Sequence, residues 1–135
     1  MRQRYKILVV DDEPITRMDI REMLQEVGYD VVAEGRNGKE AIELTQKWKP
    51  NLIIMDVKMP IMDGLKATRI IRDTSNSAVL LLTAYSQREM LVEAETAGVC
   101  AYLVKPVSEE ELLPAVEMVI DRHRKAEARD GASLP

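Results

Sequence analysis

Five polar side chains in this sequence directly follow short apolar runs, and their types suit the transfer of a phosphoryl group to a carboxylate. They are, in chain order, Asp11 and Asp12 after the first run, Asp56 after the third, Thr83 after the fourth and Lys105 after the fifth. Clustered carboxylates repel one another and therefore need a hard divalent cation with oxygen ligands, for which Mg²⁺ is suited. An ammonium and a hydroxyl can bind phosphoryl oxygens, while a carboxylate can act as the nucleophile and form an acyl phosphate.

These side chains can meet only if the apolar runs lie side by side in one sheet. The runs cover residues 7–10, 30–33, 52–55, 79–82 and 101–104. They are continuously apolar rather than alternating, which is typical of strands buried on both faces of a parallel sheet. The carboxyl ends of such strands share one edge of the sheet. We therefore expect the five polar side chains at that edge.

The segments between the runs have the apolar period of helices. The pattern predicts helices from Pro14 to a stop at Gly28, over 38–48, beyond Gly64, and over 87–97. Ser108 and Glu111 have the spacing of a capping box that opens a last helix. Strand and helix alternate five times, so the sequence predicts an α/β fold with a doubly wound, five-stranded parallel sheet.

Composition excludes several other classes of protein. A chain of 135 residues suits one compact domain, and its net charge of −4 argues against a nucleic-acid-binding body. With no Phe and one Trp, a base-stacking surface is not expected. Cys100 is the only cysteine, which excludes an internal disulfide and a thiolate zinc cluster. No apolar stretch approaches the roughly 20 residues of a membrane span, so we expect a cytoplasmic domain without membrane contact.

Four stretches together resemble the receiver domains of response regulators from two-component systems. They are ILVVDDEP at 7–14, LIIMDVKMPIMDG at 52–64, LTA at 82–84 and YLVKP at 102–106. The resemblance implies the flavodoxin-like (βα)5 fold with strand order 2-1-3-4-5. It spans residues 5–122, which we take as the receiver domain. Residues 123–135 are then a charged tail, or the start of a linker to an output domain that this chain lacks.

The resemblance also implies a role for each matching position. Asp56 resembles the phosphoacceptor, and Asp12 the carboxylate that binds Mg²⁺ directly, with Asp11 acting largely through water. The backbone carbonyl of Lys58 resembles the third protein ligand of the metal. Thr83 resembles the hydroxyl that moves toward the phosphoryl group on activation.

Five further assignments come from the same resemblance. Lys105 resembles the lysine that pairs with the phosphoryl group, and Pro106 follows it in a bond that is cis in this family. Tyr102 occupies the position of the switch aromatic, and its alternative interpretation is a half-buried strand tyrosine. Lys58 and Tyr85 occupy positions that border the path of the attacking water and tune the lifetime of the acyl phosphate.

The implied partners are a sensor histidine kinase and an output domain or target protein, with phosphorylation-dependent homodimerisation as a further expectation. The chain would not be an enzyme beyond its own Mg²⁺-dependent phosphorylation and dephosphorylation. Residues 32–38, 101–109 and 112–115 are also similar to the receivers of ANTAR-type antitermination regulators, in which an RNA-binding module follows the receiver. A stand-alone receiver is the alternative for the output.

Two other functions fit parts of the pattern. A haloacid-dehalogenase-like phosphohydrolase also passes through an aspartyl phosphate, but it carries a second Asp two residues after the nucleophile, where this chain has Lys58. A degenerate receiver used only as an interaction platform would not need the full set of acids with Thr83 and Lys105. Repeated turnover of a phosphomonoester would indicate the phosphohydrolase. Absence of Mg²⁺ binding would indicate the degenerate receiver.

Overall fold

Strands and helices alternate along the chain in a computed structural model that describes residues 5–84 and 88–132. The strands are β1 (Lys6–Val10), β2 (Asp30–Gly35), β3 (Leu52–Asp56), β4 (Ala78–Thr83) and β5 (Ala101–Val104). The helices are α1 (Pro14–Glu26), α2 (Gly38–Trp48), α3 (Gly64–Thr74), α4 (Arg88–Ala97) and α5 (Glu109–Ala132). All neighbouring strands are parallel, in the order β2-β1-β3-β4-β5. The predicted fold and strand order are confirmed.

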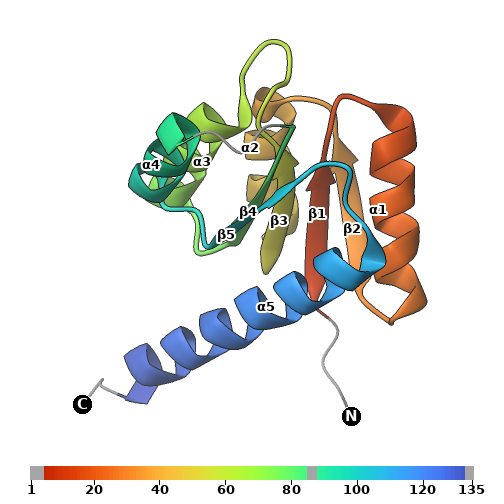
Figure 1. Ribbon diagram of the computed structural model, residues 1–135. Coiled ribbons are helices and arrows are strands. Elements are labelled where there is room, and N and C mark those ends of the chain that lie inside the picture. Colours follow the sequence, from red (N-terminus) through yellow and green to blue (C-terminus); the bar gives the residue numbers. More distant parts are fainter. Residues whose placement is uncertain (1–4, 85–87, 133–135) are drawn as a thin grey trace.

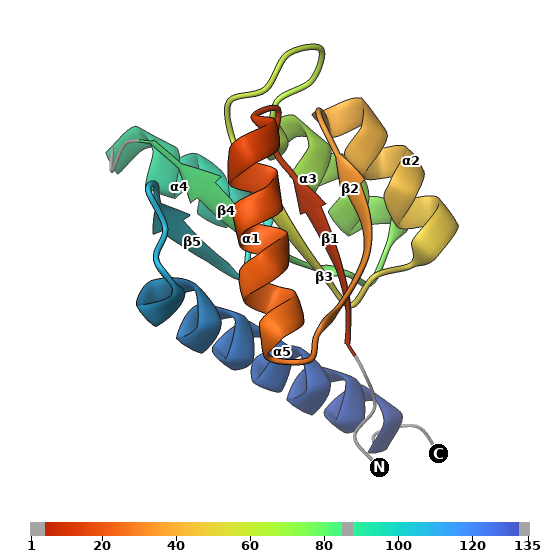
Figure 2. The same cartoon turned by 90° about the vertical axis from the view of Figure 1, so that its right-hand side faces the viewer.

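Helices cover both faces of the sheet, with α1 and α5 on one face and α2, α3 and α4 on the other (Figures 1 and 2). Successive strand residues point to opposite faces, so each central strand contributes to two hydrophobic cores. In β1, Ile7 and Val9 pack with α1 and α5, whereas Leu8 and Val10 pack with the other three helices. This burial on both faces explains why the apolar runs are continuous.

Helices begin and end where local chemistry favours it. Pro14 is the first residue of α1, where its missing N–H costs no hydrogen bond. Asp63 caps α3, since its Oδ1 accepts a hydrogen bond from the Lys66 N–H at 2.8 Å. Gly28, with φ of +94°, follows α1 in the left-handed conformation that glycine adopts at low cost. The start predicted for α4 at Gln87 lies outside the described residues.

Strand β2 contains a bulge that changes which face its last residues occupy. Successive residues of β1 pair with Val31 and then with Ala33, so Val32 is an extra residue. Val31 packs on the α1 side of the sheet and Ala33 on the α2 side, although residues two apart in a regular strand share a face. A shift of one residue inverts the faces beyond it. Glu34 therefore lies on the α1 side.

Helix α5 continues past the core. Its last core residue is Ile120, but the helix runs without a break through the predicted domain boundary at 122. His123 Nε2 lies 2.6 Å from the carbonyl oxygen of Asn76, and the guanidinium of Arg124 lies 5.5 Å from the ring centroid of Tyr5. These contacts fix the later turns of α5 against the amino end of the sheet. Neither α5 nor another helix in the described ranges has the length and apolar content of a membrane span.

Candidate functional site

Three predicted carboxylates meet at the carboxyl ends of β1 and β3. Asp11 and Asp12 follow β1, Asp56 ends β3, and one oxygen from each lies within 4.8 Å of the others. Asp11 and Asp56 are buried, with 0% and 6% exposure, whereas Asp12 is exposed. Hard divalent cations prefer clustered carboxylate oxygens of this kind. The side chains present therefore fit a bound Mg²⁺.

Lys105, which follows β5, brings a positive charge to the same carboxylates. Its Nζ lies 3.0 Å from Asp11 Oδ2 and 3.6 Å from Asp56 Oδ2. Burial disfavours the ammonium, but the hydrogen bond to Asp11 and the negative charge of Asp56 outweigh it, so the pKa of Lys105 is raised. The side chain is therefore a fixed cation at neutral pH, within reach of any anion that forms on Asp56.

Burial of Asp56 makes its charge costly in the metal-free protein. Desolvation, followed by repulsion from Asp11, raises the pKa of Asp56 from 3.8 to about 6, and Lys105 only partly offsets this. At pH 7 the carboxylate is ionised, as a nucleophile must be. A divalent cation at this site would relieve the repulsion.

We predict that the metal-free protein loses stability as the pH rises from about 4 to 6, because folded Asp56 binds its proton more tightly than unfolded Asp56 does. Allowing for water that reaches the edge of the sheet, the loss at pH 7 should be about 1–2 kcal/mol. Asp56→Asn removes this charge and should raise the free energy of unfolding at pH 7 by a similar amount. Urea unfolding of both proteins in EDTA from pH 4 to 7 measures the difference. A constant offset between the two curves across that range would contradict the prediction.

Thr83 and Pro106 lie beside these groups. Thr83 is the last residue of β4, is 4% exposed, and its carbonyl oxygen accepts a hydrogen bond from the Lys105 N–H at 2.7 Å. This main-chain bond places the ends of β4 and β5 next to each other. The Lys105–Pro106 peptide bond is cis in the structure.

The remaining residues predicted for the site are Lys58, Tyr102 and Tyr85. Lys58 is exposed in the loop after β3, two residues beyond the last residue of that strand. Tyr102 lies in β5 and is 38% exposed, so its ring is turned at least partly toward solvent. Tyr85 lies outside the described residues.

Two residues that the sequence interpretation did not assign to the site contact it. Glu13 Oε1 lies 3.3 Å from Lys105 Nζ, which makes Glu13 a third partner of the ammonium, and an exposed one. Gly64 begins α3 so close to β3 that a Cβ there would collide with the carbonyl oxygen of Asp56. The sequence predicted a helix beyond Gly64, but its pattern gave no sign of this close contact.

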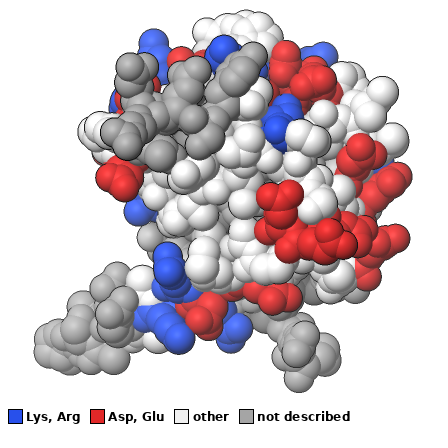
Figure 3. Space-filling view, viewed as in Figure 1, with Lys and Arg blue, Asp and Glu red and all other residues white. Residues whose placement is uncertain are grey.

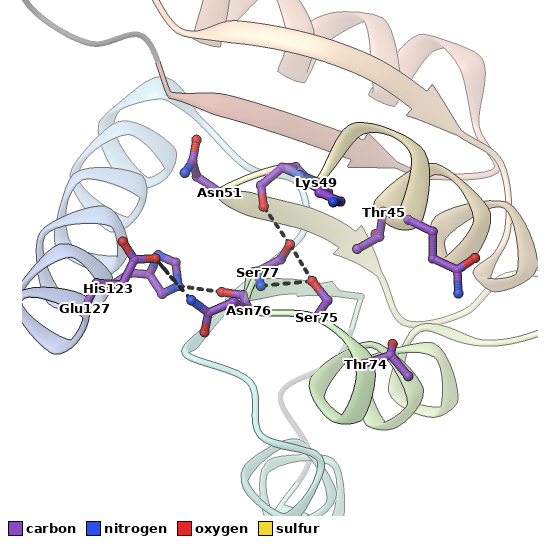
Figure 4. A pocket seen from close by; sticks show the side chains of 11 residues that line it. Thr45, Lys49, Asn51, Thr74, Ser75, Asn76, Ser77, His123 and Glu127 are labelled. Atoms are coloured by element: carbon purple, nitrogen blue, oxygen red, sulfur yellow. Dashed lines mark hydrogen bonds and ion pairs between the residues drawn. The ribbon is translucent and has the colours of Figure 1, made fainter. Parts of the chain in front are cut away.

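A separate hollow of about 390 Å³ lies at the opposite, amino end of the sheet, between the ends of α2 and α3 and the later turns of α5 (Figure 4). Several of its polar side chains bond to other parts of the chain. Ser77 Oγ donates to the carbonyl of Pro50 at 2.6 Å, and His123 bonds to the carbonyl of Asn76. We assign no reaction to this hollow, because it lies at the end of the sheet opposite the acids.

Comparison with known proteins gives consistent matches. The family described as "Response regulator receiver domain" matches residues 7–117. Transcriptional regulatory protein PdtaR of Mycobacterium tuberculosis is 45% identical over 126 residues, which is 93% of this chain but 62% of that relative's length. Chemotaxis protein CheY of Bacillus subtilis is 35% identical and aligns over 87% of this chain and 98% of its own. The solved structure of Vibrio cholerae chemotaxis protein CheY4 superposes with a TM-score of 0.81 at 33% identity, covering 87% of this chain and 99% of that one.

Proposed function

Because this chain belongs to the response regulator receiver family, we propose that it accepts a phosphoryl group on Asp56 from a sensor histidine kinase in a Mg²⁺-dependent reaction. One observation carries the proposal. Carboxylates from β1 and β3 lie within 4.8 Å of one another, and the ammonium of Lys105 lies beside two of them. This gives one edge of the sheet a nucleophile, a set of metal ligands and a cation for the phosphoryl oxygens.

Each residue of the site has its own role in the proposed reaction. One oxygen of Asp56 attacks phosphorus and forms the new O–P bond while the bond from phosphorus to the donor breaks. Lys105 and the Thr83 hydroxyl then receive phosphoryl oxygens. Asp11, Asp12 and Asp56, with the carbonyl of Lys58, would hold Mg²⁺, which neutralises charge on the transferring group when bound. Lys58 and Tyr85 are proposed to tune the lifetime of the product.

We further propose that phosphorylation is transmitted through the face formed by α4, β5 and α5. Movement of Thr83 toward the phosphoryl group would let the ring of Tyr102 turn inward. Exposed apolar side chains on these three elements support a protein partner, which is a target or a second phosphorylated copy of the chain. They are Val92, Tyr102, Val104 and Met118.

For the output we propose control of transcription by antitermination, through a module outside this chain. The similarity to ANTAR-type receivers and to a transcriptional regulatory protein supports this output. The alternative is a stand-alone receiver, which is favoured by a CheY relative that aligns over 98% of its own length. Acidic side chains gather over α1 and the first turn of α5 (Figure 3), which supports the absence of nucleic-acid binding by this chain itself.

The reaction class can be tested by stoichiometry. With acetyl phosphate and Mg²⁺, we expect incorporation of at most one phosphoryl group per chain, released by hydroxylamine and prevented by EDTA, because the acceptor is a single carboxylate. With p-nitrophenyl phosphate we expect no repeated turnover, since Lys58 stands where a hydrolase would have its acid. Multiple turnovers would instead favour the phosphohydrolase. A chain that neither binds Mg²⁺ nor becomes labelled would be an interaction platform only.

We propose that the phosphoryl transfer to Asp56 takes place in the cytoplasm.

A further inference from the structure

The main chain of Asp11 is fixed on both sides by other parts of the fold. Its N–H donates to the carbonyl of Gly35 at 3.0 Å, and its carbonyl accepts from Arg17 Nη1 at 2.7 Å. That carbonyl belongs to the planar peptide unit that joins Asp11 to Asp12. The carboxylate of Asp12 makes no hydrogen bond or ion pair within the described part of the chain. Its orientation toward the site therefore depends on this peptide unit.

Arg17 also forms an ion pair with Glu34. Its Nε lies 3.2 Å from Glu34 Oε1, and Arg21, one turn further along α1, bonds to Glu34 Oε2 at 2.7 Å. The Arg17 side chain is only 15% exposed, so its guanidinium has lost most of its contact with water. One arginine thus connects an edge strand to the loop that carries two of the three carboxylates.

The bulge in β2 makes this connection possible. If β2 were regular, with Val32 opposite Leu8, the side chain of Glu34 would point to the α2 face and could not reach α1. With the bulge, Glu34 lies on the α1 side of the sheet and forms ion pairs with Arg17 and Arg21. The bulged strand β2 and the loop that carries Asp11 and Asp12 are therefore connected through Glu34 and Arg17.

We propose that Arg17 is a positioning residue for the metal site. By holding the Asp11 carbonyl, it sets the direction in which the Asp12 carboxylate faces Asp56, and Glu34 fixes the angle of its guanidinium. This inference rests on the proposed function, because it assumes that these carboxylates bind Mg²⁺. Arg17 does not touch the phosphoryl group, and it acts only through the main chain.

Arg21 provides a matched control, because it shares Glu34 with Arg17 but does not bond to Asp11. We expect Arg17→Gln to weaken Mg²⁺ binding about 10-fold, as removal of groups that orient metal ligands does. Arg21→Gln should change binding less than about twofold, because the ligand loop keeps its contacts. Isothermal titration with Mg²⁺ alone gives both affinities. Amide exchange at Asp12 and Glu13 should be faster in Arg17→Gln only.

Labelling kinetics separate positioning from general damage to the fold. The Mg²⁺ concentration for half-maximal labelling by acetyl phosphate should rise with Arg17→Gln, while the rate at saturating Mg²⁺ stays within about threefold of the wild-type rate. If Arg17→Gln does not fold, Arg17→Lys replaces it, since one nitrogen then takes the place of the two, Nε and Nη1, with which Arg17 bonds to Glu34 and to the Asp11 carbonyl. Equal Mg²⁺ affinity in wild type and both Arg17 variants, or an equal loss in Arg21→Gln, would overturn the inference. A wild-type chain that binds no Mg²⁺ and takes no label would overturn the proposed function, and this inference with it.

Discussion

Asp56→Asn should abolish labelling by acetyl phosphate, and beryllofluoride should no longer bind. The amide that replaces the carboxylate is neutral and is not a nucleophile toward phosphorus, while its shape is nearly unchanged. Asp56 is buried beside Asp11 and Lys105, so no neighbouring acid can take its place without moving a strand end. Incorporation of radiolabelled phosphate and intact-protein mass spectrometry both report the loss.

Asp63→Asn is the matched control for this loss. Asp63 lies in the loop that follows β3, and its Oδ1 caps α3 through the Lys66 N–H. Asn is as good a cap as Asp, so the fold should be kept. The control variant should label as the wild type does. Persistent labelling of Asp56→Asn, or equal loss in both variants, would remove Asp56 as the acceptor.

Lys105→Met should lower the rate of labelling by about 100-fold, the loss typical when one preorganised donor to a developing anion is removed. Its Nζ is 3.6 Å from Asp56 Oδ2, close to where phosphoryl oxygens would form. The variant should also be less stable in EDTA, by about 3 kcal/mol, because the fully buried Asp11 carboxylate loses its ion-pair partner. Added Mg²⁺ should restore much of this stability, since it supplies the missing positive charge.

Lys105→Arg tests whether charge alone is enough. It keeps the cation near the carboxylates but replaces a compact ammonium with a planar guanidinium. We expect stability in EDTA close to that of the wild type and a labelling rate between those of the wild type and Lys105→Met. Rapid labelling kinetics measure the rates, and thermal unfolding measures stability. Wild-type labelling by Lys105→Met would show that the ammonium has no part in the transfer.

The sheet and the meeting of the acids could be predicted because both depend on regular features. Strands buried on both faces leave continuous apolar runs, and parallel strands bring their carboxyl ends to one edge. The positions of Asp11, Asp56 and Lys105 follow from these two facts alone. The predicted helix starts at Pro14 and Gly64 depended on local backbone preference, which is also visible in sequence.

Other features depend on contacts that sequence spacing does not reveal. The bulge at Val32 exists only in the pairing of two strands, so the direction of Glu34 could not be predicted from β2 alone. The same is true of the bond from Arg17 to the Asp11 carbonyl. The later turns of α5 carry no apolar period, and they are fixed by contacts with Asn76 and Tyr5, which lie far away in sequence.

Helix α5 starts three residues after Pro106 and runs for 24 residues as a single rod about 36 Å long. Each degree of tilt at its first turn would displace its far end by about 0.6 Å if the helix stayed straight. The contacts of His123 with Asn76 and of Arg124 with Tyr5 oppose such a tilt. Helix α5 thus links the end of the sheet at which Asp56 and Lys105 lie to the opposite, amino end, where these contacts hold it.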